Sequence, residues 1–398
     1  MSPKLTNLNT QELRADVARL VDEGYEVAIE SGHLVMTNVP YVTTSRTISF
    51  GTLISPLTGS FSDVVRPSDH VIMFAGDYPC DANGKPLESI RNVTCNEQVA
   101  SKWTINHRFS SKPKRGYYYD FHEKMATYAA ILANQAAAID PSVTPRTFRV
   151  IASADDSPFH YFDSASGRVG ISHVTQKLAR RSIAIVGLGG TGSYVLDYAA
   201  KTPVDEIHLF DGDIFEQHTA FRFPGAATIE EIKGRPFKVD FLSSRYSVLH
   251  RGIIPHAEYI TAENVSELQG FDMVFVCIDA NEAKVPIISA LEKYDSKFID
   301  SGIGVNLVQN GLTATLRTTT SKPNARDHVR DRNRIPMTMA PGHNEYSRNI
   351  QIVELNAIVA GFMILQWKQE CGFYRDTEHE LFSLFRVSDN HILNEDAA

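Results

Sequence analysis

A glycine-rich segment near the middle of the chain constrains the fold more than any other feature of this sequence. Residues 182–186 form a short apolar run that predicts a buried strand, and a helical pattern begins at about Tyr194. Between them, Gly187, Gly189 and Gly192 fill the three glycine positions of G-x-G-x-x-G. Glycines there allow a tight turn and a close backbone approach to a phosphate, which the start of the helix meets with oriented N–H groups. The segment therefore predicts a phosphate-binding loop between a strand and a helix.

Two acids follow the next predicted strand. Residues 206–210 are apolar enough to form that strand, and Asp211 comes directly after it, with Asp213 two residues later. Asp211 stands at the distance from the loop at which a Rossmann-type acid meets a ribose hydroxyl. Up to this point, an NAD-dependent dehydrogenase fits as well as any other nucleotide-binding enzyme.

The charges that come next favour a different ligand. Arg222 and Lys238 add two cations, and Asp279 directly follows the apolar strand predicted at residues 272–278. Cations neutralise a polyphosphate, and a carboxylate at a strand terminus can hold Mg²⁺. The combination suits a triphosphate with Mg²⁺ better than a dinucleotide.

In this order, these residues resemble the pattern of the ThiF/MoeB/ubiquitin-activating-enzyme superfamily, over about residues 164–367. The sequence departs from the pattern at Thr219, where the family has Asn, and at Phe223, where it has Gln. The remaining matches are Gly234 before Lys238, Asn281 and Lys284 after Asp279, and the strand and glycine turn at residues 298–304.

The resemblance implies roles for particular residues. The loop, with Gly190 beside the other three glycines, would bind ATP, Asp211 and Asp213 would face the ribose, and Asp279 would hold Mg²⁺. Arg222 and Lys238 would contact the phosphates. Family members also supply an arginine from a segment before the glycine strand, often from a partner protomer. Arg168 matches that position, with Arg180 and Arg181 as alternatives.

The predicted architecture is an α/β chain of two domains. Residues 160–398 would form a Rossmann-like adenylation domain, a mostly parallel sheet with helices on both faces. Residues 1–155 would form a smaller α+β domain. Its predicted elements are helices at 10–23 and 119–138 and strands at 25–29, 33–36, 46–53 and 70–74. This part resembles a domain of unknown function that is fused to bacterial ThiF-type proteins in operons with ubiquitin-like and conjugating-enzyme-like proteins.

Composition limits the remaining possibilities. The net charge of −8 over 398 residues argues against a dedicated nucleic-acid binder. The sequence contains no apolar run long enough for a membrane helix and no signal peptide, so we expect a cytoplasmic protein without a membrane partner. The four cysteines lack a C-x-x-C pair, so the structural zinc common in bacterial members of the superfamily is not expected. Cys80 has no basic neighbour that would activate it.

The crossover loop expected at residues 317–349 has no cysteine, although ubiquitin-activating relatives usually carry their acyl-accepting thiol there. Three routes stay open. The enzyme could stop at the adenylate, a cysteine from elsewhere could move in, or a loop hydroxyl could form an oxyester. Ser321 is the leading candidate for the last route, with His328 or His343 as its base.

The resulting functional prediction is ATP- and Mg²⁺-dependent adenylation of the C-terminal carboxylate of a ubiquitin-like protein. The expected partners are that protein, a conjugating-enzyme-like protein and a second copy of the chain. The alternatives are an inactive adaptor that binds the same proteins and an enzyme that adenylates a peptide, RNA-borne or other non-protein carboxylate.

Overall fold

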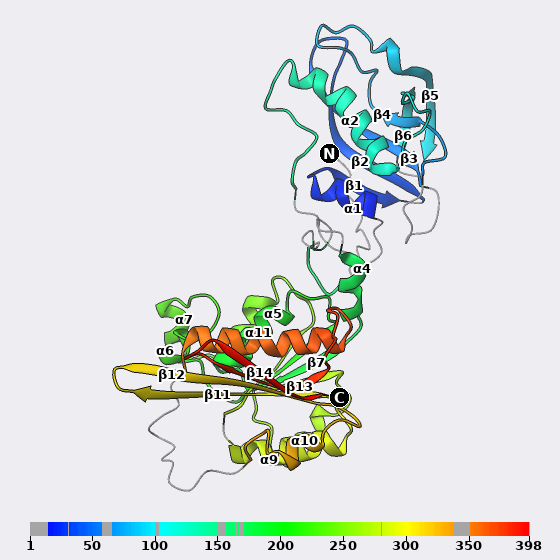
Figure 1. The fold of residues 1–398 in the computed structure, drawn as a ribbon. Helices are drawn as coiled ribbons and strands as arrows, with labels where there is room; N and C mark the ends of the chain where they lie inside the picture. Colours follow the sequence, from blue (N-terminus) through cyan, green and yellow to red (C-terminus); the bar gives the residue numbers. More distant parts are fainter. Residues whose placement is uncertain are drawn as a thin grey trace. The chain divides into compact units, whose positions relative to one another are not determined.

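Two separate sheets organise the chain, one in the unit Met1–His173 and one in the unit Val174–Ala398 (Figure 1). The computed structural model describes residues 15–30, 32–57, 66–99, 103–149, 157–161, 163, 166, 171–279, 281–337 and 351–397. The α+β character of the first unit and the α/β character of the second confirm the predicted fold class. The domain limits at 1–155 and 160–398 stay a prediction. Within the described residues, no helix is both long and apolar enough to cross a membrane.

The first unit is a six-stranded sheet in which every strand runs antiparallel to its neighbours, in the order β1-β2-β3-β4-β6-β5. Its strands are β1 (Glu26–Glu30), β2 (His33–Val42), β3 (Ile48–Pro56), β4 (Val71–Ala75), β5 (Arg91–Val99) and β6 (Trp103–Ser110).

Two helices, α1 (Ala15–Asp22) and α2 (Phe121–Ala137), cover one face of this sheet. Leu34 and Phe74 point to that face and share a core with residues of both helices, whereas the alternate residue Val35 belongs to a separate cluster on the other face. Asp120 caps α2 by accepting a hydrogen bond from the Glu123 N–H.

The sequence pattern predicted four strands and two helices of this unit, but not β5 and β6. The side chains of β5 are mostly exposed and polar, so the strand carries no apolar alternation that could be read from the sequence.

The second unit has an eight-stranded sheet in the order β14-β13-β12-β11-β10-β7-β8-β9. The five strands from β11 to β9 in this order are parallel, and β12, β13 and β14 are antiparallel additions at one edge. The strands are β7 (Ser182–Val186), β8 (Glu206–Phe210), β9 (Ile253–His256), β10 (Met273–Val276), β11 (Phe298–Val308), β12 (Gly311–Ser321), β13 (Glu380–Arg386) and β14 (His391–Ala397).

Helices lie on both faces of this sheet, as Figure 1 shows for α5 and α11 on one side and α9 and α10 on the other. Successive side chains of β7 point to opposite faces of the sheet, which explains the two layers of helices. Ile183 and Ile185 pack in the core with α5, α8 and α11, whereas Ala184 and Val186 pack with α9. The helices are α4 (Ser172–Thr175), α5 (Gly190–Ala199), α6 (Gln217–Ala220), α7 (Ile229–Lys233), α8 (Lys238–Tyr246), α9 (Asn281–Lys293), α10 (Asp327–Asp331) and α11 (Val353–Glu370).

The register of the parallel strands brings their carboxyl ends to one edge. Val186 at the end of β7 pairs with Phe210 of β8 on one side and Val276 of β10 on the other. The glycine loop and the acids that follow β8 and β10 therefore emerge side by side, the usual place for a ligand in an open α/β sheet.

One expectation about this unit is corrected. Residues 317–321, expected to begin a long crossover loop, are the last part of strand β12 and pair with β11. The stretch consists of Arg317 followed by threonines and a serine, and its strand character comes from the pairing with β11 rather than from an apolar pattern.

Candidate active site

The glycine loop has the geometry that a phosphate-binding turn requires. Gly187 has a φ of 90°, in the left-handed region, and a Cβ added at Gly192 would lie 1.9 Å from the Gly187 carbonyl oxygen. Both positions need glycine for the turn itself. Gly189, the N-cap residue of α5, is different, because a Cβ there would meet no atom of the described residues within 4 Å. The described part of the fold leaves Gly189 facing open space, as a loop that admits a ligand must.

Gly190 is held against the long helix α11. A Cβ at Gly190 would come within 2.1 Å of Asn356 Nδ2, and the Thr191 hydroxyl donates to Asn356 Oδ1 at 3.1 Å. Asn356 is buried, and its Nδ2 has no hydrogen-bond partner among the described residues. This contact could not be predicted from local sequence, because Asn356 lies 166 residues beyond Gly190.

Asp211 is a buried carboxylate that is hydrogen-bonded to the glycine loop. Its Oδ2 accepts a hydrogen bond from the Leu188 N–H at 2.6 Å, and its Oδ1 accepts one from the Asp213 N–H at 2.8 Å. Burial raises the pKa of Asp211 above its ordinary value, although the Lys238 charge opposes the shift. Asp211 therefore links the end of β8 to the loop that follows β7.

Lys238, the first residue of α8, lies between the two acids. Its Nζ is 2.6 Å from Asp213 Oδ2 and 3.7 Å from Asp211 Oδ2, and only 6% of the residue is exposed. Its backbone N–H also donates to the Asp213 carbonyl at 2.9 Å. The residue expected at the phosphates thus lies beside the two residues expected at the ribose.

Tyr259 completes this group, and the sequence did not reveal it. Its hydroxyl donates to Asp213 Oδ1, which raises the pKa of Tyr259 to about 12. Burial alone would raise the pKa of Asp213, but the hydrogen bonds from Lys238 and Tyr259 hold it below its ordinary value. Asp213 is therefore a fully ionised acceptor at neutral pH.

Arg222 and Asp279 form the second part of the site. Burial lowers the pKa of Arg222, while the negative charges of Asp279 and Asp213 oppose that shift, which places the guanidinium near both acids. Its Nε is buried and has no hydrogen-bond partner among the described residues. Asp279 Oδ2 accepts from Gln351 Nε2 at 2.9 Å, a neighbour that sequence analysis did not identify.

One of the two departures from the family pattern is explained by packing. Phe223 is only 3% exposed and packs edge-to-face on Phe215 at 5.1 Å between ring centroids, so an apolar residue fits this position. Thr219 is also buried. Lys284, which matches the basic residue after the metal-binding acid, pairs instead with the fully buried Asp300 at 2.7 Å.

Ser321 does not lie where an acyl acceptor must. It is the last residue of β12, pairs with Phe298 and has no exposed surface, so the expectation of an accessible loop nucleophile is wrong for this residue. His328 Nε2 lies 3.1 Å from the Thr320 carbonyl oxygen rather than beside the Ser321 hydroxyl. The core packing of β12 on β11 removes the hydroxyl from solvent.

Three of the four cysteines lie in surroundings that disfavour an activated thiol. Burial raises the pKa of Cys80, Cys277 and Cys371, which disfavours the reactive thiolate, and none of the four cysteines is exposed.

Arg168 and His343 lie outside the described residues. Arg181 pairs with Asp272 at the opposite end of the strands from the loop.

These residues fit a nucleotide with Mg²⁺. Among the described residues, the open space at Gly189, the unpaired Nε of Arg222 and the carboxylate of Asp279 supply a cradle, a cation and a hard oxygen ligand. Asp279 would hold the ion, while Lys238 and Arg222 would bind phosphate oxygens.

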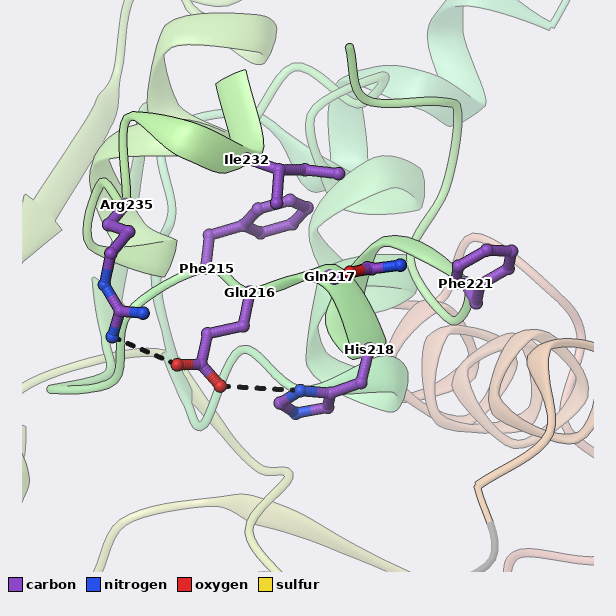
Figure 2. Close-up of a pocket in the computed structure, with 7 residues that line it drawn as sticks. All are labelled: Phe215, Glu216, Gln217, His218, Phe221, Ile232 and Arg235. Carbon is purple, nitrogen blue, oxygen red and sulfur yellow. Dashed lines mark hydrogen bonds and ion pairs between the residues drawn. The ribbon is translucent and has the colours of Figure 1, made fainter. Parts of the chain in front are cut away.

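A surface cavity of about 570 Å³ lies in the segment between Asp213 and Lys238. Figure 2 shows that Glu216 reaches both Arg235, at 3.1 Å, and His218, at 3.5 Å. The cavity is lined by residues 215–218, Phe221, Ile232 and Arg235. None of the predicted site residues lines this cavity, so it is distinct from the site described above.

A glycine loop, acids at the ends of parallel strands and two partly or fully buried cations define a Rossmann-like nucleotide-binding domain. The family model described as "ThiF family" matches residues 165–367, slightly more than half of the chain, and the chain belongs to that family. A second model, described as "Domain of unknown function (DUF6791)", matches residues 15–164.

Curated relatives match part of the chain. The chain is 24% identical over 169 residues to ubiquitin-like modifier-activating enzyme 5 of Aedes aegypti, covering 40% of this chain and 42% of the relative. It is 26% identical over 178 residues to the Drosophila mojavensis protein of that name, covering 42% and 45%. The chain thus spans less than half the length of these relatives.

Solved structures show a weaker likeness. A structure of E. coli MccB with MccA-N7isoASN has a TM-score of 0.45 at 15% identity, covering 59% of this chain and 72% of that one. A structure of PaaA has a TM-score of 0.43 at 16% identity, covering 57% and 76%.

Proposed function

We propose that the second unit adenylates the C-terminal carboxylate of a small ubiquitin-like protein, using ATP and Mg²⁺. The observation that carries the proposal is the grouping of Asp213, Arg222, Lys238 and Asp279 beside the glycine loop. Two acids and two cations in one place suit a metal-bound polyphosphate better than a dinucleotide, whose pyrophosphate the loop alone can satisfy. Family membership and the curated relatives support the same class of reaction.

In this proposal the chain acts mainly by positioning and by charge neutralisation. The carboxylate oxygen attacks the α-phosphorus, the bond to the leaving oxygen breaks, and pyrophosphate departs. Bound at Asp279, Mg²⁺ would neutralise phosphate charge. Arg222 and Lys238 would stabilise the charge that develops on the phosphates. Lys238 has three N–H donors, so it can keep its contact with Asp213 while it donates to a phosphate oxygen.

The acyl adenylate is the product that these residues support best. Ser321 is buried and none of the four cysteines is exposed, so we assign the attacking nucleophile to a partner molecule. The acceptor then displaces AMP from the carbonyl carbon. An oxyester on this chain would require a hydroxyl other than Ser321.

The wider context belongs to the same proposal. The first unit would recruit the ubiquitin-like protein or a conjugating-enzyme-like partner in a bacterial pathway, two copies of the chain would associate, and Arg168 would reach the phosphates, in cis or from the second copy. The reaction would take place in the cytoplasm, where ATP is available and the four free thiols stay reduced.

The substrate assignment is tested with ATP labelled on the α-phosphate and a small ubiquitin-like protein. We expect labelled AMP on the protein with a free C-terminal carboxylate and none on the same protein with a C-terminal amide. Equal labelling of both forms would contradict the proposal. ATP binding without labelling of either form would favour the adaptor.

A further inference from the structure

A cluster of metal-binding side chains lies at the β9 edge of the second sheet, outside the residues assigned above. His256 ends β9, Glu258 follows two residues later, and Glu267 lies in the 3-10 turn Val265–Leu268. One ligand atom from each residue lies within 4.8 Å of the other two. One imidazole and two carboxylates at this spacing can converge on a single ion after small side-chain rotations.

A second imidazole lies beside the cluster. His208 Nδ1, from the neighbouring strand β8, is 3.0 Å from His256 Nε2, and the two rings are stacked. His256 also stacks on Phe210 at 4.3 Å between ring centroids, so its orientation is fixed by packing.

The segment after β9 folds back so that both glutamates reach the same histidine. Asn264 Nδ2 donates to Glu258 Oε2 and to the Tyr259 carbonyl oxygen, both at 3.0 Å. Asn264 Oδ1 accepts from the Thr261 N–H at 2.7 Å. These bonds shape the segment independently of any ion and place Glu258 beside Glu267.

We propose that His256, Glu258 and Glu267 bind a divalent transition-metal ion of the Zn²⁺ class. Mixed imidazole and carboxylate donors suit Zn²⁺, and a three-residue set leaves a position for water or for His208. The same segment carries Tyr259, whose hydroxyl donates to Asp213. The ion therefore links β9 to a segment that contacts the candidate nucleotide site. This site is separate from the Mg²⁺ position assigned to Asp279 and does not depend on the adenylation proposal.

The test is a titration of the metal-free full chain with Zn²⁺ alone, in competition with a chromophoric chelator. We expect one equivalent to bind, and we expect Glu258→Gln and Glu267→Gln each to weaken binding at least about tenfold, the lower end of the cost of disturbing a metal site. Both glutamates are exposed, so these variants should fold, and circular dichroism checks that they do.

Two control variants locate the ion. Glu263→Gln alters the same segment outside the cluster, and Asp279→Asn alters the proposed Mg²⁺ ligand; both should bind Zn²⁺ as the wild type does. Zn²⁺ should also raise the melting temperature of the wild type but not that of Glu267→Gln. Wild-type affinity in both cluster variants would overturn the proposal, as would loss of binding in Asp279→Asn alone.

Discussion

The Nζ of Lys238 lies 2.6 Å from Asp213 Oδ2, in a site where the lysine is almost fully buried. The contact joins the first turn of α8 to the segment after β8, 25 residues earlier in the chain. A buried ammonium paired with a half-exposed carboxylate leaves the lysine oriented toward the site with donor capacity to spare. The proposed reaction uses that spare capacity to bind phosphate.

Removing this ammonium should therefore impair catalysis. We expect Lys238→Ala to lower the rate of pyrophosphate exchange by about 10²- to 10³-fold, the scale for losing one preorganised charge stabiliser. The matched control is Lys233→Ala, at the exposed end of α7. Turnover in Lys238→Ala equal to that of the control would refute the assignment, provided that circular dichroism shows both variants folded.

A substitution at Gly189 should affect ligand binding without affecting folding. Because a Cβ at Gly189 meets no atom within 4 Å in the part of the chain that the structure describes, Gly189→Ala should fold with nearly the wild-type melting temperature. It should nevertheless weaken ATP binding at least about tenfold, since the added methyl occupies the space where a phosphate approaches the backbone. Calorimetric titration measures the effect, with Gly361→Ala, also unobstructed, as the control. Undiminished ATP affinity in Gly189→Ala would place the phosphate elsewhere.

Tyr259 should act as a positioning residue for Asp213. Tyr259→Phe removes one hydrogen bond to a carboxylate at the protein surface, which we expect to cost about 1 kcal/mol, or roughly a five- to tenfold rise in the Kd of ATP. Tyr374→Phe, at another partly exposed tyrosine, should leave the Kd unchanged. If the two variants bind ATP equally well, the contact of Tyr259 with Asp213 does not serve nucleotide binding.

A pH-dependent prediction concerns the first unit. Lys124 is 1% exposed, donates to Ser55 and Asp69, and has a pKa lowered by burial from its ordinary value of 10.5. Between the lowered folded-state pKa and the unfolded value, the unfolded chain binds more protons, so the free energy of unfolding rises with pH. Lys124→Met should abolish that rise in the alkaline range between the lowered folded-state pKa and the unfolded value of 10.5.

The measurement is the free energy of unfolding by urea at several pH values, taken from the unfolding transition that the substitution shifts. Lys112→Met, at an exposed lysine, serves as the control and should keep the wild-type slope. The same slope in wild type and Lys124→Met would show that this lysine titrates alike in the folded and unfolded chain.

The core of the nucleotide site could be predicted from the sequence because its signals are local. A glycine turn after an apolar run, and single acids such as Asp211 and Asp279 directly after other apolar runs, mark the carboxyl ends of parallel strands. Their meeting at one edge then follows from the topology alone.

The parts that were missed depend on contacts between distant segments. Ser321 is buried in strand β12, which pairs with β11, and the Thr-rich sequence around Ser321 does not predict that pairing. Tyr259 follows β9, a four-residue strand that contains a proline and has too few residues for a periodic pattern. The partner of Lys284 is Asp300 rather than a group at the site, which only the packing of α9 on β11 reveals.

The most direct test of the central claim is ATP–pyrophosphate exchange in the presence of the ubiquitin-like protein, comparing wild type with Asp279→Asn and with Asp240→Asn, an exposed acid on α8. The account predicts exchange that requires the ubiquitin-like protein, persists in Asp240→Asn and falls by at least about 10²-fold in Asp279→Asn. Exchange that survives in Asp279→Asn, or no exchange in a wild type that binds ATP, would contradict it.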